Sequence, residues 1–245
     1  MNQSTFSYKN DFYGAVMLNP STLAQIATAA ATWREILAFH GQLASDEYVE
    51  YLDAFYREGI RRFGDHWVYM DIVNVLYAAA KTVQPERYLE IGVRRGRSVC
   101  TVARGCPSVR IVACDMWQTN YAGMENPGPA FVAEELQRHG LSGDVEFLNG
   151  DSHVLLPQYF ADHPDTEFDM ITVDGDHSEP GALADLCTVI PHLAVGGVLV
   201  FDDIAHPEHP YLLSVWRTAL SQFPCLSGYE FTEMGYGVAF AVRRR

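Results

Sequence analysis

Apolar residues in the first third of the chain recur at steps of three and four positions, the spacing of one face of a helix. After Asn19-Pro20, a typical helix start, this spacing is followed by Leu23, Ile26, Ala30, Trp33 and Leu37. Two more helical patterns cover Ser45–Phe63 and residues 67–82. No linker rich in proline, glycine or serine follows them. Residues 1–84 are therefore predicted to be a helical N-terminal extension that packs on a main domain and serves as a lid or an oligomer surface.

From residue 87 the pattern changes to short apolar runs that alternate with helical stretches. The runs are Arg87–Ile91, Val109–Cys114, Val145–Leu148, Phe168–Val173 and Gly197–Phe201. The helical stretches lie near residues 97–104, 129–140, 152–160, 179–192 and 210–222. Alternation of strands with helices predicts a parallel sheet that is covered by helices on both faces.

The last two apolar runs have a different relationship. Tyr229–Glu233 and Tyr236–Val242 are separated only by Met234-Gly235, and so short a connection joins antiparallel strands. Residues 85–245 are therefore predicted to form an α/β domain. Its doubly wound, Rossmann-like and mainly parallel seven-stranded sheet ends in an antiparallel hairpin.

Composition and charge narrow the class of protein. The chain has 245 residues, of which 48% are hydrophobic, enough to bury a large core. Seventeen Lys and Arg against 31 Asp and Glu give a net charge of −14, which repels phosphate backbones and anionic membranes. We therefore expect neither nucleic acid nor a membrane as a partner. A helical extension rich in Tyr and Phe would suit a homo-oligomer.

Two further features bear on the compartment. Five cysteines without a C-x-x-C pair are typical of free thiols in a reducing compartment. Residues 12–33 carry no charge, but Asn19, Pro20 and Gln25 interrupt them. This segment is therefore interpreted as a turn followed by a helix, and not as a signal peptide or a membrane span. The protein is predicted to be cytoplasmic.

Acidic residues follow nearly every predicted strand. Ligands of doubly wound sheets bind outside the carboxyl ends of the strands, where this chain carries Glu90 to Gly96, Asp115, Gly150-Asp151, Asp174 to His177, and Asp202-Asp203. These positions are the candidates for a binding site.

The first turn, L-E-I-G-V-R-R-G-R-S, does not match the dinucleotide fingerprint G-x-G-x-x-G, because Arg94 stands where its second glycine would be. A carboxylate at Glu90 repels a pyrophosphate but suits an amino group and a sulfonium. Asp115 can accept hydrogen bonds from a ribose diol, and Asp151-Ser152 can receive an adenine amino group. The alternatives are an ion pair of Glu90 with a nearby arginine and a helix-capping role for Asp115.

The ordered series E-x-G-x-x-x-G-x-S, a strand-ending acid, G-D-S, V-D-G-D-H-S and G-G-V-L-V-F-D-D resembles the class I S-adenosylmethionine-dependent methyltransferases. The resemblance covers about residues 85–243. It is closer to the small-molecule O-methyltransferase branch that includes macrolide-sugar methyltransferases and cephalosporin-hydroxylase-like proteins. It implies a hydroxylated small-molecule substrate, a sugar or natural-product intermediate. It also implies that the cofactor is bound by Glu90, Gly92, Gly96, Ser98, Asp115, Trp117, Asp151, Ser152 and Asp174.

Carboxylates at the tips of neighbouring strands, about 4.8 Å apart, predict a cation site. Asp174, Asp202 and Asp203 would repel one another unless a cation sits among them or some are protonated, and oxygen ligands suit Mg²⁺. The resemblance implies that Asp174 and His177 are catalytic, with His177 as the general base. The alternatives are a capping role for Asp174 and a structural or substrate-contacting role for His177.

The sequence offers two further candidate segments at the site and two competing functions. His206 and His209 are interpreted as lid or substrate residues, and Asn120–Pro129, with Tyr121, Met124 and Glu125, as a lid loop. The first competing function is an NADP-dependent oxidoreductase that grips a 2′-phosphate with Arg94, Arg95 and Arg97. The second is a methyltransferase-like binding protein without catalytic activity.

Overall fold

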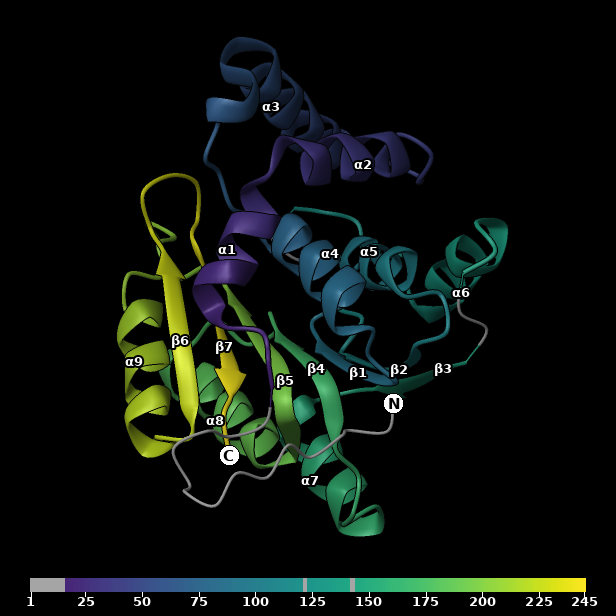
Figure 1. Ribbon diagram of the computed structural model, residues 1–245. Helices are drawn as coiled ribbons and strands as arrows, with labels where there is room; N and C mark the ends of the chain where they lie inside the picture. Colours follow the sequence, from purple (N-terminus) through teal and green to yellow (C-terminus); the bar gives the residue numbers. More distant parts are fainter. Residues whose placement is uncertain (1–15, 121–122, 142–143) are drawn as a thin grey trace.

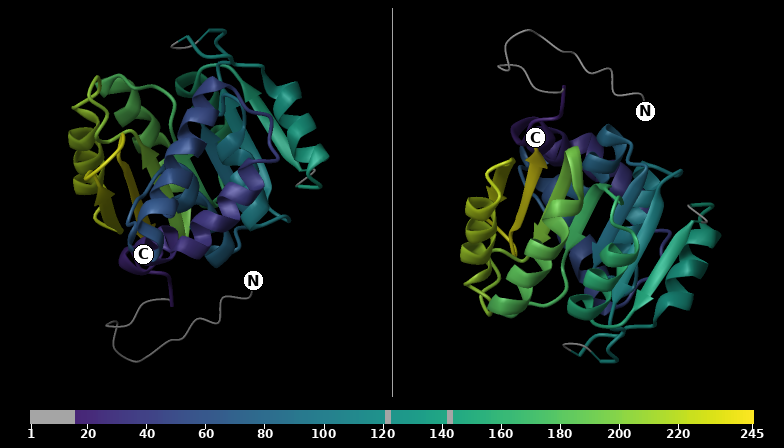
Figure 2. Two further views of the ribbon diagram at one scale, coloured as in Figure 1. Left: turned by 90° about the horizontal axis from the view of Figure 1, so that it is seen from above. Right: turned by 90° about the horizontal axis from the view of Figure 1, so that it is seen from below.

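A seven-stranded sheet lies between two layers of helices in the computed structural model, which describes residues 16–120, 123–141 and 144–245 (Figures 1 and 2). The strands are β1 (Arg87–Ile91), β2 (Arg110–Asp115), β3 (Val145–Asn149), β4 (Phe168–Val173), β5 (Leu193–Asp202), β6 (Leu226–Phe231) and β7 (Val238–Arg243). Their order is β3-β2-β1-β4-β5-β7-β6. Strand β7 is antiparallel to both β5 and β6, and the other pairs are parallel. The predicted fold class is confirmed.

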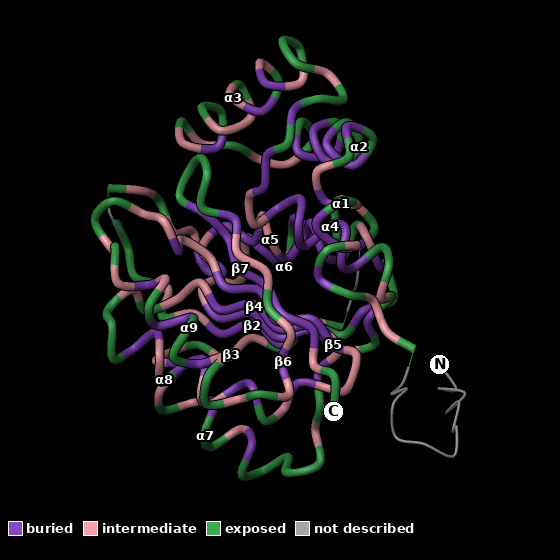
Figure 3. Tube along the Cα trace, turned by 60° about the vertical axis from the view of Figure 1, so that its left-hand side comes forward, coloured by how far each residue is buried: buried purple, intermediate pink, exposed green. Residues whose placement is uncertain are grey.

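The two faces of the sheet are covered by different helices. One face carries α1 (Pro20–Thr28), α4 (Ile72–Val83), α5 (Arg97–Gly105) and α6 (Pro129–Arg138). The other carries α7 (Ser152–Asp162), α8 (Glu179–Val189) and α9 (Leu212–Gln222). Side chains alternate along the strands, so Tyr88 packs in the first core and Leu89 in the second. The central strands are mostly buried, whereas the edge strands β3 and β6 are partly exposed (Figure 3).

The N-terminal helices divide into two groups. Helices α1 and α4 share one continuous core with the sheet across residue 84, whereas α2 (Ala30–His40) and α3 (Glu47–Phe63) stand farther from it (Figure 1). A buried aromatic cluster of Trp33, Tyr56, Trp67 and Tyr69 connects them to the body. Within it, the Trp33 indole N–H donates to the Tyr69 carbonyl at 3.2 Å.

The first predicted helix is interrupted at Ala29, whose backbone is extended. A break leaves carbonyls at the end of α1 without helical partners. The Thr32 hydroxyl donates to the Ile26 carbonyl at 2.7 Å, and the Asn74 side-chain amide donates to the Ala27 carbonyl at 2.9 Å. These contacts come from residues outside α1, which is why apolar spacing alone does not reveal the break.

Two other boundaries differ from the prediction. Helix α4 begins at Ile72 and not at 67, because Asp71 and Asn74 form a reciprocal capping box there. The terminal strands pair in antiparallel fashion as predicted, but residues 232–237 connect them and not Met234-Gly235 alone. None of the described helices is long and apolar enough to cross a membrane.

Candidate active site

A cavity of about 750 Å³ opens at the carboxyl ends of β1, β2, β4 and β5. The order of the strands reverses between β1 and β4, which is where doubly wound sheets bind ligands. The N-terminal helices and the β6–β7 connection also contribute to its wall, through Tyr48, Tyr69, Asp71 and Tyr236. The site is therefore assembled from both predicted parts of the chain.

Glycine at position 92 permits the tight turn after β1. Its φ is +87°, and a β-carbon there would lie 1.9 Å from the carbonyl oxygen of Asp174. Only glycine combines that backbone conformation with so close an approach. Gly92 and Ser98 line the cavity, whereas Gly96 packs against Val132 and lines a smaller pocket beside it.

The carboxylate of Glu90 lies beneath the turn and not on the cavity wall, in contrast to the contact expected from the sequence. The side chain is fully buried, and its two oxygens accept hydrogen bonds from the Tyr88 and Ser98 hydroxyls. Burial outweighs these bonds and the pKa of Glu90 is raised to about 8. In this structure Glu90 therefore contacts the hydroxyls of Tyr88 and Ser98, and it supports the turn through Ser98.

The three arginines of the turn are paired with other acids. Arg94 pairs with Asp46, Arg95 with Glu125 at 2.5 Å, and Arg97 with Asp53 at 2.8 Å. The ion pair considered between Glu90 and these arginines is not among the contacts of the described residues. The guanidinium groups instead tie the turn to the region around α3 and to the loop after β2.

Asp115 ends β2 and holds the first turn in place. Its Oδ2 accepts from the backbone N–H groups of Val93 at 2.7 Å and Arg94 at 2.8 Å, and its Oδ1 accepts from the N–H of Trp117. The carboxylate lines the cavity. Oδ1 also accepts from the Asn126 side-chain amide at 3.4 Å, so two donors face each oxygen, and the bond from Asn126 is the longest of the four.

The residues expected around an adenine lie at the same end of the cavity, with one exception. Asp151 caps α7 through the His153 N–H at 2.9 Å, and Ser152 donates to Asp185 at 2.7 Å; both line the cavity. Trp117 is not among the described lining residues. Its indole N–H donates to the Asn149 side chain at 2.7 Å.

Two carboxylates from neighbouring strand ends meet at one imidazole. His177 Nε2 lies 3.6 Å from Asp174 Oδ1 and 3.0 Å from Asp203 Oδ2. Burial alone would lower the pKa of His177, but the hydrogen bonds and charges of both carboxylates raise it to about 11. Burial raises the pKa of Asp174 to about 6, against the hydrogen bond from His177.

Asp202 ends β5 on the cavity wall, but it does not join the compact group formed by Asp174, His177 and Asp203, whose ligand atoms lie within 4.8 Å of one another. Burial, and then the charges of Asp203 and Asp174, raise the pKa of Asp202 well above its ordinary value. Asp203 follows in a left-handed conformation with φ +61°, which aspartate tolerates better than most residues. Of the three predicted ligands, Asp174 and Asp203 are therefore the pair brought together.

Another acid in this cavity, Asp71, was not identified from the sequence. It precedes α4, accepts from the Tyr56 hydroxyl at 2.7 Å and the Tyr69 hydroxyl at 3.3 Å, and lines the cavity. Burial raises its pKa, and the charge of Asp203 adds to the effect. The pattern D-x-x-N before an apolar run is a capping signal, but it does not reveal proximity to β4 and β5.

The residues expected to form a lid are only partly described. Tyr121 lies outside the described residues. Met124 lines the cavity, and Glu125 pairs with Arg95. His206 and His209 form a separate group with Glu208 in the loop after β5.

Comparisons with known proteins agree with this geometry. Residues 89–204 match a family model described as a methyltransferase domain. The O-methyltransferase TomG from Streptomyces achromogenes, solved with SAM, has a TM-score of 0.58 and 22% identity, covering 88% of this chain and 99% of its own. Cofactor-bound Rv0187 from MTB has a TM-score of 0.55 and 22% identity, covering 90% of each chain. CalS11, a TDP-rhamnose 3′-O-methyltransferase, has a TM-score of 0.55 and 21% identity, covering 93% and 96%. A search of curated proteins gave no significant match.

The sheet order, the terminal antiparallel pair and the cavity at the carboxyl edge define the fold of the class I S-adenosylmethionine-dependent methyltransferases. Residues 89–204, a little under half of the chain, match the methyltransferase-domain family model. The resemblance found in the sequence is thereby confirmed.

Proposed function

We propose that the protein is an S-adenosylmethionine-dependent O-methyltransferase that acts on a hydroxyl of a small molecule, a sugar or natural-product intermediate. In this proposal a divalent cation assists and His177 is the general base. The observation that carries the proposal is the convergence of Asp174 and Asp203 on His177 Nε2, at 3.6 Å and 3.0 Å, in the cavity that Gly92 and Asp115 also line.

The donor end of the cavity has the groups that S-adenosylmethionine needs. In this proposal Asp115 accepts from the ribose diol, Ser152 and Asp151 hold the adenine, and the Gly92 turn admits the methionine portion. The supporting observation is that all four residues line the same cavity. The neighbouring arginines are compensated by Asp46, Glu125 and Asp53. A 2′-phosphate would have to compete with these acids, which favours a sulfonium donor over NADP.

The acceptor end is aromatic and lies beside the acidic group. Tyr48, Phe55 and Tyr69 from the N-terminal segment and Tyr236 from the β6–β7 connection line it. Rings of this kind pack against the flat or apolar faces of small molecules, and phenol groups add hydrogen bonds. This composition supports a small hydroxylated acceptor, and it gives the N-terminal helices the role of an acceptor wall.

The donor set fits a divalent cation. Asp174 and Asp203 would hold it, and Asp202 and Asp71 lie nearby. Burial raises the pKa of Asp202 and of Asp71 and favours their neutral forms, and a cation among these carboxyl groups would favour the charged forms. Oxygen ligands of this kind suit Mg²⁺. A divalent cation held there would lower the pKa of an acceptor hydroxyl.

His177 completes the proposed reaction. Without a cation, both carboxylates raise the pKa of His177 to about 11 and hold it as an imidazolium. A cation held by Asp174 and Asp203 would offset their negative charge and lower this pKa, so that the Nε2 facing them could accept a hydroxyl proton. The alkoxide oxygen then attacks the methyl carbon of the sulfonium, the carbon–sulfur bond breaks, and the sulfur leaves as a neutral thioether. Asp174 and Asp203 stabilise the imidazolium that remains.

Calorimetric titration tests the donor assignment. We expect S-adenosylhomocysteine to bind and NADPH not to bind. Binding of NADPH alone would establish the oxidoreductase alternative, and binding of neither would favour a non-catalytic protein. Methyl transfer from labelled donor to a panel of hydroxylated sugars and phenols, with Mg²⁺ and with EDTA, then tests the acceptor class and the cation.

A further inference from the structure

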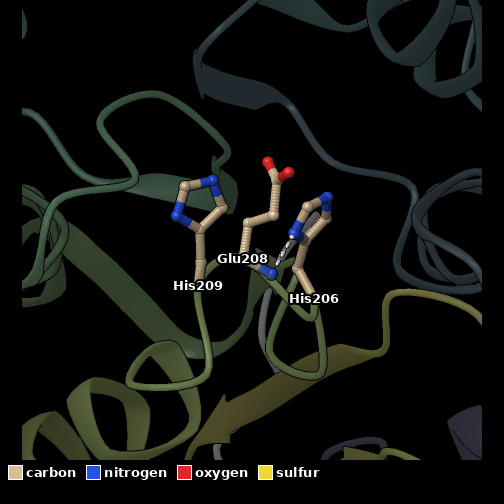
Figure 4. A group of neighbouring side chains, drawn as sticks. All are labelled: His206, Glu208 and His209. Carbon is tan, nitrogen blue, oxygen red and sulfur yellow. Dashed lines mark hydrogen bonds between the residues drawn. The ribbon is translucent and has the colours of Figure 1, made fainter.

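The loop between β5 and α9 carries a second group of potential metal ligands that differs chemically from the acidic group. His206, Glu208 and His209 each offer a ligand atom, and these atoms lie within 4.8 Å of one another. Figure 4 shows the Glu208 side chain between the two imidazole rings. In the described part of the chain, the residues lining the main cavity do not include these three. We propose that this group is a binding site for a transition-metal ion such as Zn²⁺.

The tautomer of His209 favours binding through Nε2. His209 Nδ1 lies 3.1 Å from the Tyr211 hydroxyl, and that hydroxyl donates its single proton to the His177 carbonyl at 2.8 Å. The hydroxyl oxygen can therefore only accept from His209, so Nδ1 carries the proton and Nε2 keeps its lone pair. A histidine whose second nitrogen donates to a fixed oxygen is the usual arrangement of a metal ligand.

His206 is the other imidazole of the group. Its Nδ1 accepts the backbone N–H of Glu208 at 3.1 Å, and its ring lies 4.1 Å from the ring of Tyr236. Binding a metal through Nδ1 would cost this imidazole the bond from Glu208, whereas binding through Nε2 would leave that bond in place. The ring itself stays beside its partners, because Pro207 limits the backbone between the two histidines. The loss of one neutral hydrogen bond, about 1 kcal/mol net, is small compared with the formation of metal–ligand bonds.

The ligand chemistry separates this site from the acidic one. Two imidazoles and one carboxylate, with a water as a fourth ligand, suit Zn²⁺ and its neighbours in the first transition row. Mg²⁺ prefers the oxygen ligands of Asp174 and Asp203. The two groups are adjacent, because the His209 ring stacks on that of His177 with centroids 5.1 Å apart. Glu208 is exposed and both histidines are half-buried, so the site is open to solvent.

Titration of the metal-free full chain with Co²⁺, followed by its visible absorption, tests the proposal. In an excess of Mg²⁺, which would occupy the proposed site at Asp174 and Asp203, we expect a one-to-one Co²⁺ complex with nitrogen ligands that Zn²⁺ displaces. His209→Ala and Glu208→Gln should each weaken Co²⁺ binding by about tenfold or more, and Tyr211→Phe by a similar factor. His66→Ala, a change of an exposed histidine elsewhere, should leave it unchanged.

Asp203→Asn separates the two sites. If the ion occupies the histidine group, this variant keeps its Co²⁺ complex, and circular dichroism confirms that all variants are folded. The proposal is overturned if the wild-type chain gives no complex, if His209→Ala binds as tightly as wild type, or if Asp203→Asn abolishes the signal. Binding of S-adenosylhomocysteine is measured in parallel, so failure of this site is distinguishable from failure of the proposed enzymatic function.

Discussion

Gly92 and Asp174 lie in backbone contact, with 1.9 Å between the carbonyl oxygen of Asp174 and the position that a β-carbon on Gly92 would occupy. The Asp174 N–H also donates to the Ile91 carbonyl at 2.9 Å. The turn after β1 and the start of the acidic group are therefore one rigid unit. A change on the donor side of the cavity is transmitted directly to the proposed catalytic side.

Substitution Gly92→Ala should impair both halves of the site. The clash with Asp174 adds to the cost of a positive φ, and overpacking of this kind costs about 1–3 kcal/mol. We expect a lower melting temperature, weaker S-adenosylhomocysteine binding and weaker Mg²⁺ binding. Gly140→Ala is the matched control, because Gly140 has φ +62° and no atom within 4 Å of its would-be β-carbon. If Gly92→Ala weakened the binding of S-adenosylhomocysteine and of Mg²⁺ no more than Gly140→Ala does, the proposed coupling would be refuted.

Removal of the imidazole tests the proposed base. His177→Ala should lower turnover by about 10²–10⁴-fold near neutral pH, with S-adenosylhomocysteine binding little changed. Treatment of the wild-type enzyme with EDTA should abolish turnover, and Mg²⁺ should restore it. Steady-state kinetics check both points. Turnover at the wild-type rate in the variant would exclude His177 as the base, and full activity in EDTA would exclude the cation.

The pH dependence of stability follows from the same ion pairs. The pKa of His177 is raised from 6.5 to about 11 in the metal-free protein, so its stabilising contribution is complete below pH 6.5 and is lost progressively as pH rises toward 11. The difference in melting temperature between the wild type and His177→Gln, both in EDTA, should shrink from pH 7 to pH 10. A difference that stays constant over this range would show that His177 is not held as an imidazolium.

Neutralisation of Asp71 should weaken the cation site without unfolding the protein. Asparagine is as good a helix cap as aspartate, so Asp71→Asn keeps the start of α4. It removes a charge that helps to raise the pKa of both Asp174 and Asp202. We expect Mg²⁺ affinity to fall by roughly tenfold or less, as measured by calorimetry. Asp165→Asn, at an exposed position before β4, is the control and should have no effect.

Substitutions at Glu90 and at Asp115 should differ in their effect on the binding of S-adenosylhomocysteine. Glu90→Gln keeps the buried shape, so we expect binding of S-adenosylhomocysteine to change little. Asp115→Asn removes a charged acceptor that holds the turn, which should weaken binding by about tenfold or more. Calorimetry of both variants checks this. An equal loss in Glu90→Gln would restore the direct contact with the donor that the sequence suggested.

Glu90→Gln also has a predicted effect on stability. Burial raises the pKa of Glu90 from 4.5 to about 8. Between these pH values Glu90 ionises in the unfolded chain but stays protonated in the folded protein, so stability falls as pH rises from 4.5 to 8. The variant should be as stable as the wild type near pH 5 and relatively more stable near pH 9. Melting temperatures of the wild type and of Glu90→Gln, measured near pH 5 and near pH 9, test this prediction. An equal difference at both pH values would contradict it.

Much of the sheet could be predicted because its strands are buried on both faces and form continuous apolar runs. The bounds of β1 and β4 agree with the sequence pattern to the residue. The position of Glu90 could have been inferred from strand alternation, since it shares a face with Tyr88 and therefore points toward a helix layer. Its acidic character suggested a ligand contact instead.

Other features depend on contacts between distant residues. The break at Ala29 requires Thr32 and Asn74, and the role of Asp71 requires the N-terminal segment to meet β4 and β5. The separation of Asp202 from Asp203 follows from a single left-handed residue at the end of β5. Such features are set by tertiary packing, which local spacing does not encode.

Different parts of the sequence line different parts of the cavity. The residues proposed to bind the donor lie within the stretch that matches the methyltransferase family model, whereas much of the aromatic wall comes from residues 48–72, which precede that stretch. Under the proposed function, changes in α3 and the segment after it should alter substrate preference and leave the proposed donor-binding half intact. Grafting this segment between relatives would be a direct route to redesigned acceptor selectivity.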